Sequence, residues 1–228
     1  MKRILLAATA AFAFAAAQPA IAADAPVYKG PAPVAAVLFN WTGFYIGATA
    51  GYGWGTTNQS DGFVSSPTFK WDGALVGGTI GWNWQAPGSA IVFGIEGDIS
   101  WAGIKGSLPT SGAWGCGGPT CHNEVQSLAT IRGRLGVAMD RVLVFATGGW
   151  AYGKVYADFN SCAGACVANT NSGWTAGAGF EWAFAQNVSM KVEYLYVDLG
   201  SFVATVPGGT TGLVAKFNLV RVGANWRF

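Results

Sequence analysis

Four cysteines and one histidine carry the most reactive side chains of this 228-residue chain. The cysteines form two close pairs, Cys116 with Cys121 and Cys162 with Cys166, and His122 follows the first pair directly. Thiolates and imidazole can bind zinc, but these spacings are not typical of zinc sites. Four cysteines allow three disulfide connectivities, and we predict pairing within each close pair because each pair closes a small loop. We expect no metal and no cofactor.

Enzymatic chemistry has few residues to build on. Hydrolases that use a nucleophile or an acidic pair need an aligned histidine base, and His122 is the only histidine of the chain. The glycine pairs Gly77-Gly78 and Gly148-Gly149 lack the Lys-Ser/Thr element of a phosphate loop. The sequence therefore predicts a protein that is not an enzyme.

A second set of chemically capable residues consists of single charges inside otherwise apolar segments. Four are acidic and four are basic, so they can form ion pairs: Glu96, Asp98, Glu181 and Glu193 with Arg132, Arg134, Lys191 and Arg221. On a soluble β protein they would be ordinary surface charges. Whether these eight residues form ion pairs or are surface charges depends on the secondary-structure elements that carry them.

These elements are strands, because apolar residues recur at every second position. Eight segments show the alternation: 43–54, 72–84, 90–101, 125–138, 142–154, 173–184, 188–199 and 214–228. In 90–101, Ile95 and Ile99 share one face, while Glu96 and Asp98 share the other. After Asn40 no apolar run approaches the 18 residues of a membrane helix.

Alternation also assigns faces in the segments 125–138 and 142–154, and only the second is apolar on both faces. In 125–138 the apolar set is Val125, Ala129, Ile131, Leu135 and Val137, against Gln126, Arg132 and Arg134. Segment 142–154 is apolar on both faces, and we favour an outer set of Val142, Val144, Ala146, Gly148, Trp150 and Tyr152.

Strand length, connections and faces together predict a transmembrane barrel. Each strand is near the ~9–11 residues that cross a membrane when tilted. Short turns at 85–89, 139–141 and 185–187 alternate with long polar loops at 55–70, 102–124, 155–172 and 200–213, as in outer-membrane barrels with short periplasmic turns and long extracellular loops. A soluble sandwich or lipocalin-type barrel would instead place its apolar face inside. We therefore predict an all-β, eight-stranded antiparallel barrel with the eight charges paired in its interior.

Aromatic residues gather at the strand ends, which suits the two membrane interfaces. The predicted periplasmic girdle contains Trp41, Phe44, Trp84, Phe184, Trp226 and Phe228. The predicted outer girdle contains Trp54, Trp71, Trp101, Trp174 and Tyr196.

The N-terminal segment is typical of export. Lys2 and Arg3 precede an apolar run, and Ala20-Ile21-Ala22 is a small-x-small cleavage site. A membrane anchor is the alternative, but the run is shorter than the ~20 residues that it needs. We predict a signal peptide at 1–22, a Pro-rich periplasmic tether at 23–40 and the barrel at 41–228. Export to an oxidising compartment favours the disulfides.

Composition limits the function further. Apolar residues make up 51% of the chain and charged residues 11%, and the formal net charge is +2. Such a chain is too apolar to be disordered. It has no basic run that could follow a nucleic-acid backbone, so we expect no nucleic-acid partner.

Several short segments are similar to a known family. They are Ala25-Pro26-Val27-Tyr28-Lys29, Trp41-Thr42-Gly43-Phe44-Tyr45-Ile46-Gly47, Gly81-Trp82-Asn83-Trp84-Gln85, Gly94-Ile95-Glu96-Gly97-Asp98, Arg132-Gly133-Arg134-Leu135-Gly136 and Val222-Gly223-Ala224-Asn225-Trp226-Arg227-Phe228. Together they resemble the small, opacity-type or porin-like outer-membrane β-barrel family of rhizobia-like alphaproteobacteria. The resemblance implies a surface protein whose last residues, Trp226 and Phe228, form the signal read by the barrel-insertion machinery. Family members are described as porin-like, immunogenic, envelope-stabilising or haem-binding, and the resemblance does not choose among these. The two cysteine pairs depart from the family pattern.

The leading functional prediction is an envelope-structural outer-membrane protein that displays its loops and whose interior is plugged by charge pairs. Its expected partners are outer-membrane lipid and lipopolysaccharide, the insertion machinery, and an extracellular ligand bound by the loops. The alternative is a narrow porin-type channel for ions or small solutes. A membrane-embedded enzyme acting on lipid or peptide is a third, weaker hypothesis.

Overall fold

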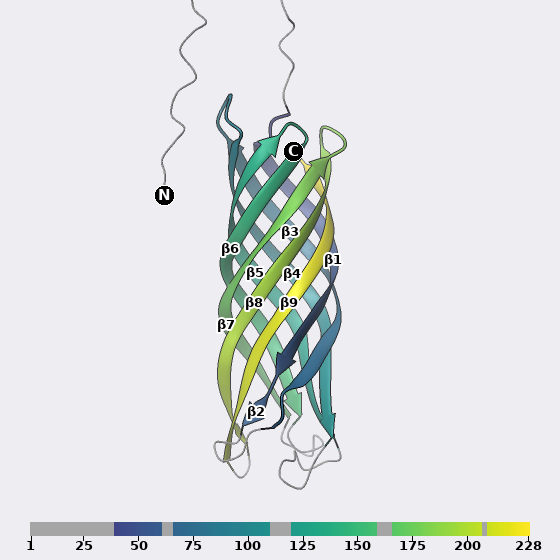
Figure 1. Cartoon of the computed structure of the whole chain (residues 1–228), viewed down its shortest axis with the longest axis vertical. Coiled ribbons are helices and arrows are strands. Elements are labelled where there is room, and N and C mark those ends of the chain that lie inside the picture. The colour runs from purple at the N-terminus through teal and green to yellow at the C-terminus, as the bar shows by residue number, and fades with distance from the viewer. Residues whose placement is uncertain (1–38, 61–65, 110–119, 159–165, 207–208) are drawn as a thin grey trace, which may run out of the picture. The chain divides into compact units, whose positions relative to one another are not determined.

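The computed structural model describes residues 39–60, 66–109, 120–158, 166–206 and 209–228. In this part of the chain, eight long antiparallel strands and one two-residue strand form a sheet that closes where β1 pairs with β9 (Figure 1). The strands are β1 (Gly43–Thr57), β2 (Gln59–Ser60), β3 (Phe69–Gln85), β4 (Ile91–Pro109), β5 (Thr120–Met139), β6 (Val142–Asp158), β7 (Cys166–Ala183), β8 (Val188–Val206) and β9 (Gly209–Arg227). The predicted eight-stranded antiparallel barrel is confirmed. The described residues include no helix long and apolar enough to span a membrane.

The two faces of the wall follow the predicted alternation. In β4 the side chains of Ile95 and Ile99 are exposed, whereas Glu96 and Asp98 are buried. In β6 the favoured phase is correct, because Val144 is exposed and Leu143 is only 1% exposed. An apolar outward face at this depth requires a hydrocarbon solvent rather than water.

The short turns lie at the end of the barrel that carries the C-terminus (Figure 1). Asp140 and Arg141 alone connect β5 to β6, and Asp140 adopts the left-handed conformation with φ of 51°. Left-handed residues in a two-residue turn match the twist of the flanking strands, and Asp tolerates this conformation better than most residues.

The strands extend further toward the long-loop end than the alternation predicted. They contain 15 to 20 residues, or about 50 to 65 Å of strand, where a membrane crossing needs ~9–11 residues. The predicted loops at 55–70, 102–124, 155–172 and 200–213 are therefore partly wrong, because they contain strand ends. Cys121 and His122, assigned to a loop, lie in β5.

The extensions reverse the polarity of the two faces. Past the outer aromatic residues, the exposed outward side chains are polar: Thr56, Lys70, Asp72, Lys105, Ser107, His122, Lys154, Thr170, Ser172 and Lys216. The inward side chains of this region form an apolar cluster, the outer core: Trp71, Leu75, Ile104, Val125, Leu128, Ala151, Val155, Leu195, Val197, Leu199, Ala215, Phe217 and Leu219. The outer section is thus packed like a water-soluble barrel.

Three residues assigned to the outer wall point inward instead. Trp71 belongs to the outer core because it shares the phase of Leu75 along β3. Val125 is fully buried because a register shift between Val125 and Ser127 reverses the alternation. Such a bulge adds one residue to one strand and exchanges its faces. Trp41 enters the barrel because the chain turns at Gly43, whose φ of 143° suits glycine.

The remaining girdle residues point outward as predicted. Phe44, Trp84, Phe184, Trp226 and Phe228 are exposed at the short-turn end, and Trp54, Trp101 and Trp174 at the other. Phe39, two residues before the predicted boundary at 41, is buried beside Trp41. The predicted signal peptide at 1–22 and most of the tether at 23–40 lie outside the described residues.

Candidate functional site: a charge network inside the barrel

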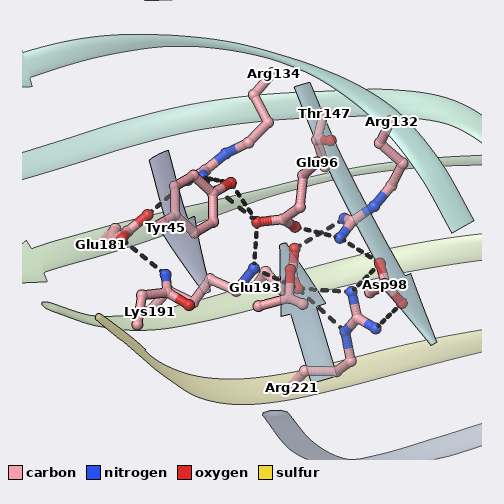
Figure 2. A network of polar contacts seen from close by, with 12 residues as sticks. Tyr45, Glu96, Asp98, Arg132, Arg134, Thr147, Glu181, Lys191, Glu193 and Arg221 are labelled. Carbon is pink, nitrogen blue, oxygen red and sulfur yellow. Dashed lines mark hydrogen bonds and ion pairs between the residues drawn. The ribbon is translucent and has the colours of Figure 1, made fainter. Parts of the chain in front are cut away.

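All eight charged residues singled out in the sequence lie inside the barrel, and none is more than 7% exposed (Figure 2). They project inward from β4, β5, β7, β8 and β9. The four carboxylates and four cations balance each other: Glu96, Asp98, Glu181 and Glu193 with Arg132, Arg134, Lys191 and Arg221. Buried charges are tolerated only when they are paired and hydrogen-bonded.

Arg132 is the residue that joins most of these groups. Its Nη2 lies 2.5 Å from Oε1 of Glu96 and 2.9 Å from Oδ2 of Asp98, both on the neighbouring strand β4. Its Nη1 reaches across the barrel to Oε2 of Glu193 on β8, at 2.9 Å. The remaining donor, Nε, bonds to Oγ1 of Thr130. The planar guanidinium thus uses its fork of donors to join three carboxylates.

Arg221 and Lys191 complete the central cluster. Nη1 of Arg221 lies 2.8 Å from Oδ1 of Asp98, and its Nη2 lies 2.8 Å from Oε1 of Glu193. Nζ of Lys191 lies 2.7 Å from Oε2 of Glu96. Each of the three acids therefore contacts at least two cations, and the cluster bridges strands that are far apart in the sheet.

A branch of the network runs toward the short-turn end through Arg134. Its Nη2 lies 2.8 Å from Oε2 of Glu181, and its Nη1 donates to the hydroxyl of Tyr45 at 2.7 Å. That hydroxyl in turn donates to Oε2 of Glu96 at 2.7 Å, joining the branch to the central cluster (Figure 2). Gly81 leaves room for the ring, since a Cβ there would lie 2.3 Å from Cζ of Tyr45.

Tyr45 is buried in the barrel, but nothing in the sequence identified it as one of the network residues. Three further polar residues were missed in the same way. Thr130 donates to Asp98, while Ser189 and Asn225 both donate to Oε1 of Glu181. The sequence does not distinguish these three residues, because small polar residues also occur on the inner face without charged partners.

An apolar cluster lies on each side of the network along the barrel. The outer core lies on one side. On the other side a second cluster, the inner cap, contains Phe39, Trp41, Val92, Ala138, Leu143, Phe145 and Ala183. Trp41 is anchored there by its Nε1, which donates to the carbonyl of Asp140, and by its backbone N–H, which donates to Oε1 of Gln85.

The family model described as "Outer membrane protein beta-barrel domain" matches residues 4–228. The chain belongs to the outer-membrane β-barrel protein family. The barrel is therefore located in the outer membrane, and its apolar outward face at network depth is the face in contact with lipid.

Relatives of this outer-membrane β-barrel protein carry names that agree with this location. The "31 kDa outer-membrane immunogenic protein" of Brucella melitensis is 38% identical over all of both chains. The "22 kDa outer membrane protein" of Rhizobium leguminosarum is 29% identical, over 83% of this chain and 79% of the relative. Among solved structures, the Neisserial surface protein NspA is 14% identical with a TM-score of 0.45, covering 82% of this chain and 98% of its own.

The other candidate residues of this outer-membrane β-barrel protein lie apart from the network. Trp226 and Phe228 are exposed at the short-turn end, and the N–H of Phe228 donates to the carbonyl of Phe44. Their role as an insertion signal stays a prediction. His122 is exposed on β5. Among the described residues, no group of three or more His, Cys, Asp or Glu side chains could hold a metal ion.

The structure describes only two of the four cysteines, Cys121 and the backbone of Cys166. Cys121 is buried and disulfide-bonded. Cys116 and Cys162 lie outside the described residues, and only the backbone of Cys166 is described, at the start of β7. The predicted pairing within each close pair therefore stays a prediction.

Proposed function

We propose that this outer-membrane β-barrel protein is a non-enzymatic structural and surface-display protein whose interior does not conduct ions. The observation that carries the proposal is the charge network, in which Arg132 joins strands β4, β5 and β8 across the interior. Eight strands enclose a space that side chains can fill. The apolar clusters on both sides of the network add two further barriers to ions.

Planar-bilayer recording of the purified, refolded protein tests this proposal. We expect no steady current through the wild type. The double variant Arg132→Ala with Arg221→Ala removes two of the cations that bridge the interior. Its current is compared with that of the wild type. A reproducible ohmic current through the wild type would contradict the proposal.

The narrow channel remains the second candidate, and one observation favours it. Among the described residues, several buried polar atoms near the network have no hydrogen-bond partner, including Oγ1 of Thr49, Oγ of Ser100 and Oδ1 of Asn225. Buried polar groups are commonly satisfied by internal water. A chain of such waters is what a narrow ion path would need, and the same recording separates the two functions.

The display role rests on the outer section. Strands such as β4 and β5 continue beyond the apolar band and carry polar outward side chains, including Lys105 and Ser107. The relative from Brucella melitensis is named immunogenic, and we infer that this chain likewise presents its outer connections to the exterior. Antibodies raised against a peptide covering 110–119 should bind intact cells. Binding only after the outer membrane is broken would contradict this role.

A further inference from the structure

A groove of about 550 Å³ lies on the outside of the barrel wall, away from the charge network. Residues of β1, β3, β8 and β9 line it. Five of them are aromatic: Tyr52, Trp54 and Tyr196 point outward, whereas Trp71 and Phe217 belong to the outer core behind the groove. Polar side chains share the same surface, notably Asp72, Asn218, Lys70 and Lys216. Pockets of this size commonly hold small-molecule ligands or headgroups.

Strand register arranges these side chains in rows. Thr56 pairs with Lys70 on β3 and with Lys216 on β9, so the two lysines stand on either side of one threonine. Strands lie ~4.8 Å apart, which separates the lysine Cα atoms by about 10 Å. The next row toward the membrane contains Trp54, flanked by Asp72 and Asn218.

The rows place the groove at the outer edge of the lipid-facing surface. Two rows below Trp54, the outward side chains are Ala50, Val76 and Val222, which are apolar. Tryptophan and tyrosine rings favour the membrane–water interface. The lysines one row above Trp54 thus lie at headgroup depth, where lipid headgroups are the ligands within reach.

Among the residues that the structure describes, some of the charged side chains of the groove have partners, and one does not. Nζ of Lys216 lies 3.0 Å from Oδ2 of Asp198, and Asp72 accepts a hydrogen bond from the hydroxyl of Tyr52. Within the described part of the chain, Lys70 has no ion-pair partner. Its ammonium is therefore available to an anion, and Lys216 can be shared with one.

We propose that this groove binds the phosphorylated sugar headgroup of an outer-leaflet glycolipid. The flat rings of Trp54 and Tyr196 pack against a sugar, the carboxylate of Asp72 and the amide of Asn218 bond to its hydroxyls, and the two lysines bind its phosphate. This proposal deepens the envelope-structural role. The lipid-binding proposal does not depend on whether the interior conducts ions. A current through the wild type would therefore contradict the proposed function alone, and a failed lipid-binding test would contradict the groove proposal alone.

The test measures binding of lipid A, in mixed micelles, to the refolded full chain by titration of tryptophan fluorescence. The variants are Lys70→Gln alone and Lys70→Gln combined with Lys216→Gln. Lys105→Gln is the matched control, because Lys105 is also an exposed lysine of the outer section that pairs with an acid, Glu124, at 3.4 Å. Heat-modifiable migration on a denaturing gel verifies that each variant is folded.

The expected loss of affinity is about fivefold for Lys70→Gln and tenfold or more for the double variant, since one lysine near an anionic surface contributes ~1 kcal/mol. Lys105→Gln should bind like the wild type, and dephosphorylated lipid A should bind weakly to all variants. Equal binding by the double variant and the control would overturn the proposal. So would displacement of the lipid by millimolar inorganic phosphate, because the site would then be specific for a free anion.

Discussion

Two sections of the same barrel arrange polar and apolar side chains in opposite ways. At network depth, Ile95 and Val222 are exposed on the outside while Arg132 is buried within. In the outer section, Lys70 is exposed on the outside while Trp71 is buried within. The same strands run through both sections, so the strand alone does not determine the polarity of a face. The surrounding solvent does, because lipid requires an apolar exterior and water permits a polar one.

The two interiors should therefore respond differently to substitution. In the charged section each side chain depends on several partners, and removing one leaves the others unpaired. In the outer core the contacts are non-directional, so the loss of stability on substitution follows the side-chain volume removed.

The largest effect is expected for Arg132→Met. Methionine fills similar space but leaves Glu96, Asp98 and Glu193 without their shared cation. We expect the free energy of unfolding to fall by about 3–5 kcal/mol, the usual cost of breaking a buried ion pair. Urea unfolding in phospholipid vesicles measures this change.

A double-mutant cycle shows whether that loss comes from the network. Adding Glu193→Gln to Arg132→Met should recover part of the stability, with a coupling of about 0.5–3 kcal/mol. If Arg132→Met leaves stability unchanged and no acid couples to it, the charges do not form a network in the membrane.

The outer core should show the cavity behaviour of a soluble protein. Leu195 is fully buried, and Leu195→Ala should cost about 2–5 kcal/mol. Leu195→Met conserves volume and should cost less than about 1.5 kcal/mol. The same unfolding assay applies, and equal costs for the two variants would argue against a packed outer core.

The smallest effect is expected on the outward face of the outer section. Lys105 is 67% exposed and pairs with Glu124, and Lys105→Gln should cost at most about 1 kcal/mol. Added salt should reduce even this difference, because exposed ion pairs are screened. A loss as large as that of Arg132→Met would mean that this surface is not in water.

The sequence predicted the section of the barrel that faces lipid, because there the apolar positions of the alternation point outward. In 188–199, Lys191 and Glu193 alternate with apolar residues, and both point inward as expected. Lipid imposes that pattern on every residue of the outward face. The strand ends were missed because water imposes no such rule, so Lys105 and Ser107 looked like loop residues.

The network's membership was predictable, but its connections were not. Alternation assigns Arg132 to the inner face, and the pairing of β4 with β5 brings Glu96 and Asp98 beside it. Alternation carries no information on which strands face each other across the interior, so the contact with Glu193 was not foreseen. Val125 failed for a different reason, since one bulge exchanges the two faces and leaves the local composition unchanged.

The most direct test of the polarity reversal is an arginine scan along the outward face of β4. Ile95→Arg and Ile99→Arg place a charge between the two aromatic girdles, Ser107→Arg places the same charge beyond the outer girdle, and urea unfolding in vesicles gives the cost of each. We expect a loss of about 2–4 kcal/mol at Ile95 and at Ile99, and about 0–1 kcal/mol at Ser107. Equal losses at all three positions, or the largest loss at Ser107, would contradict the account.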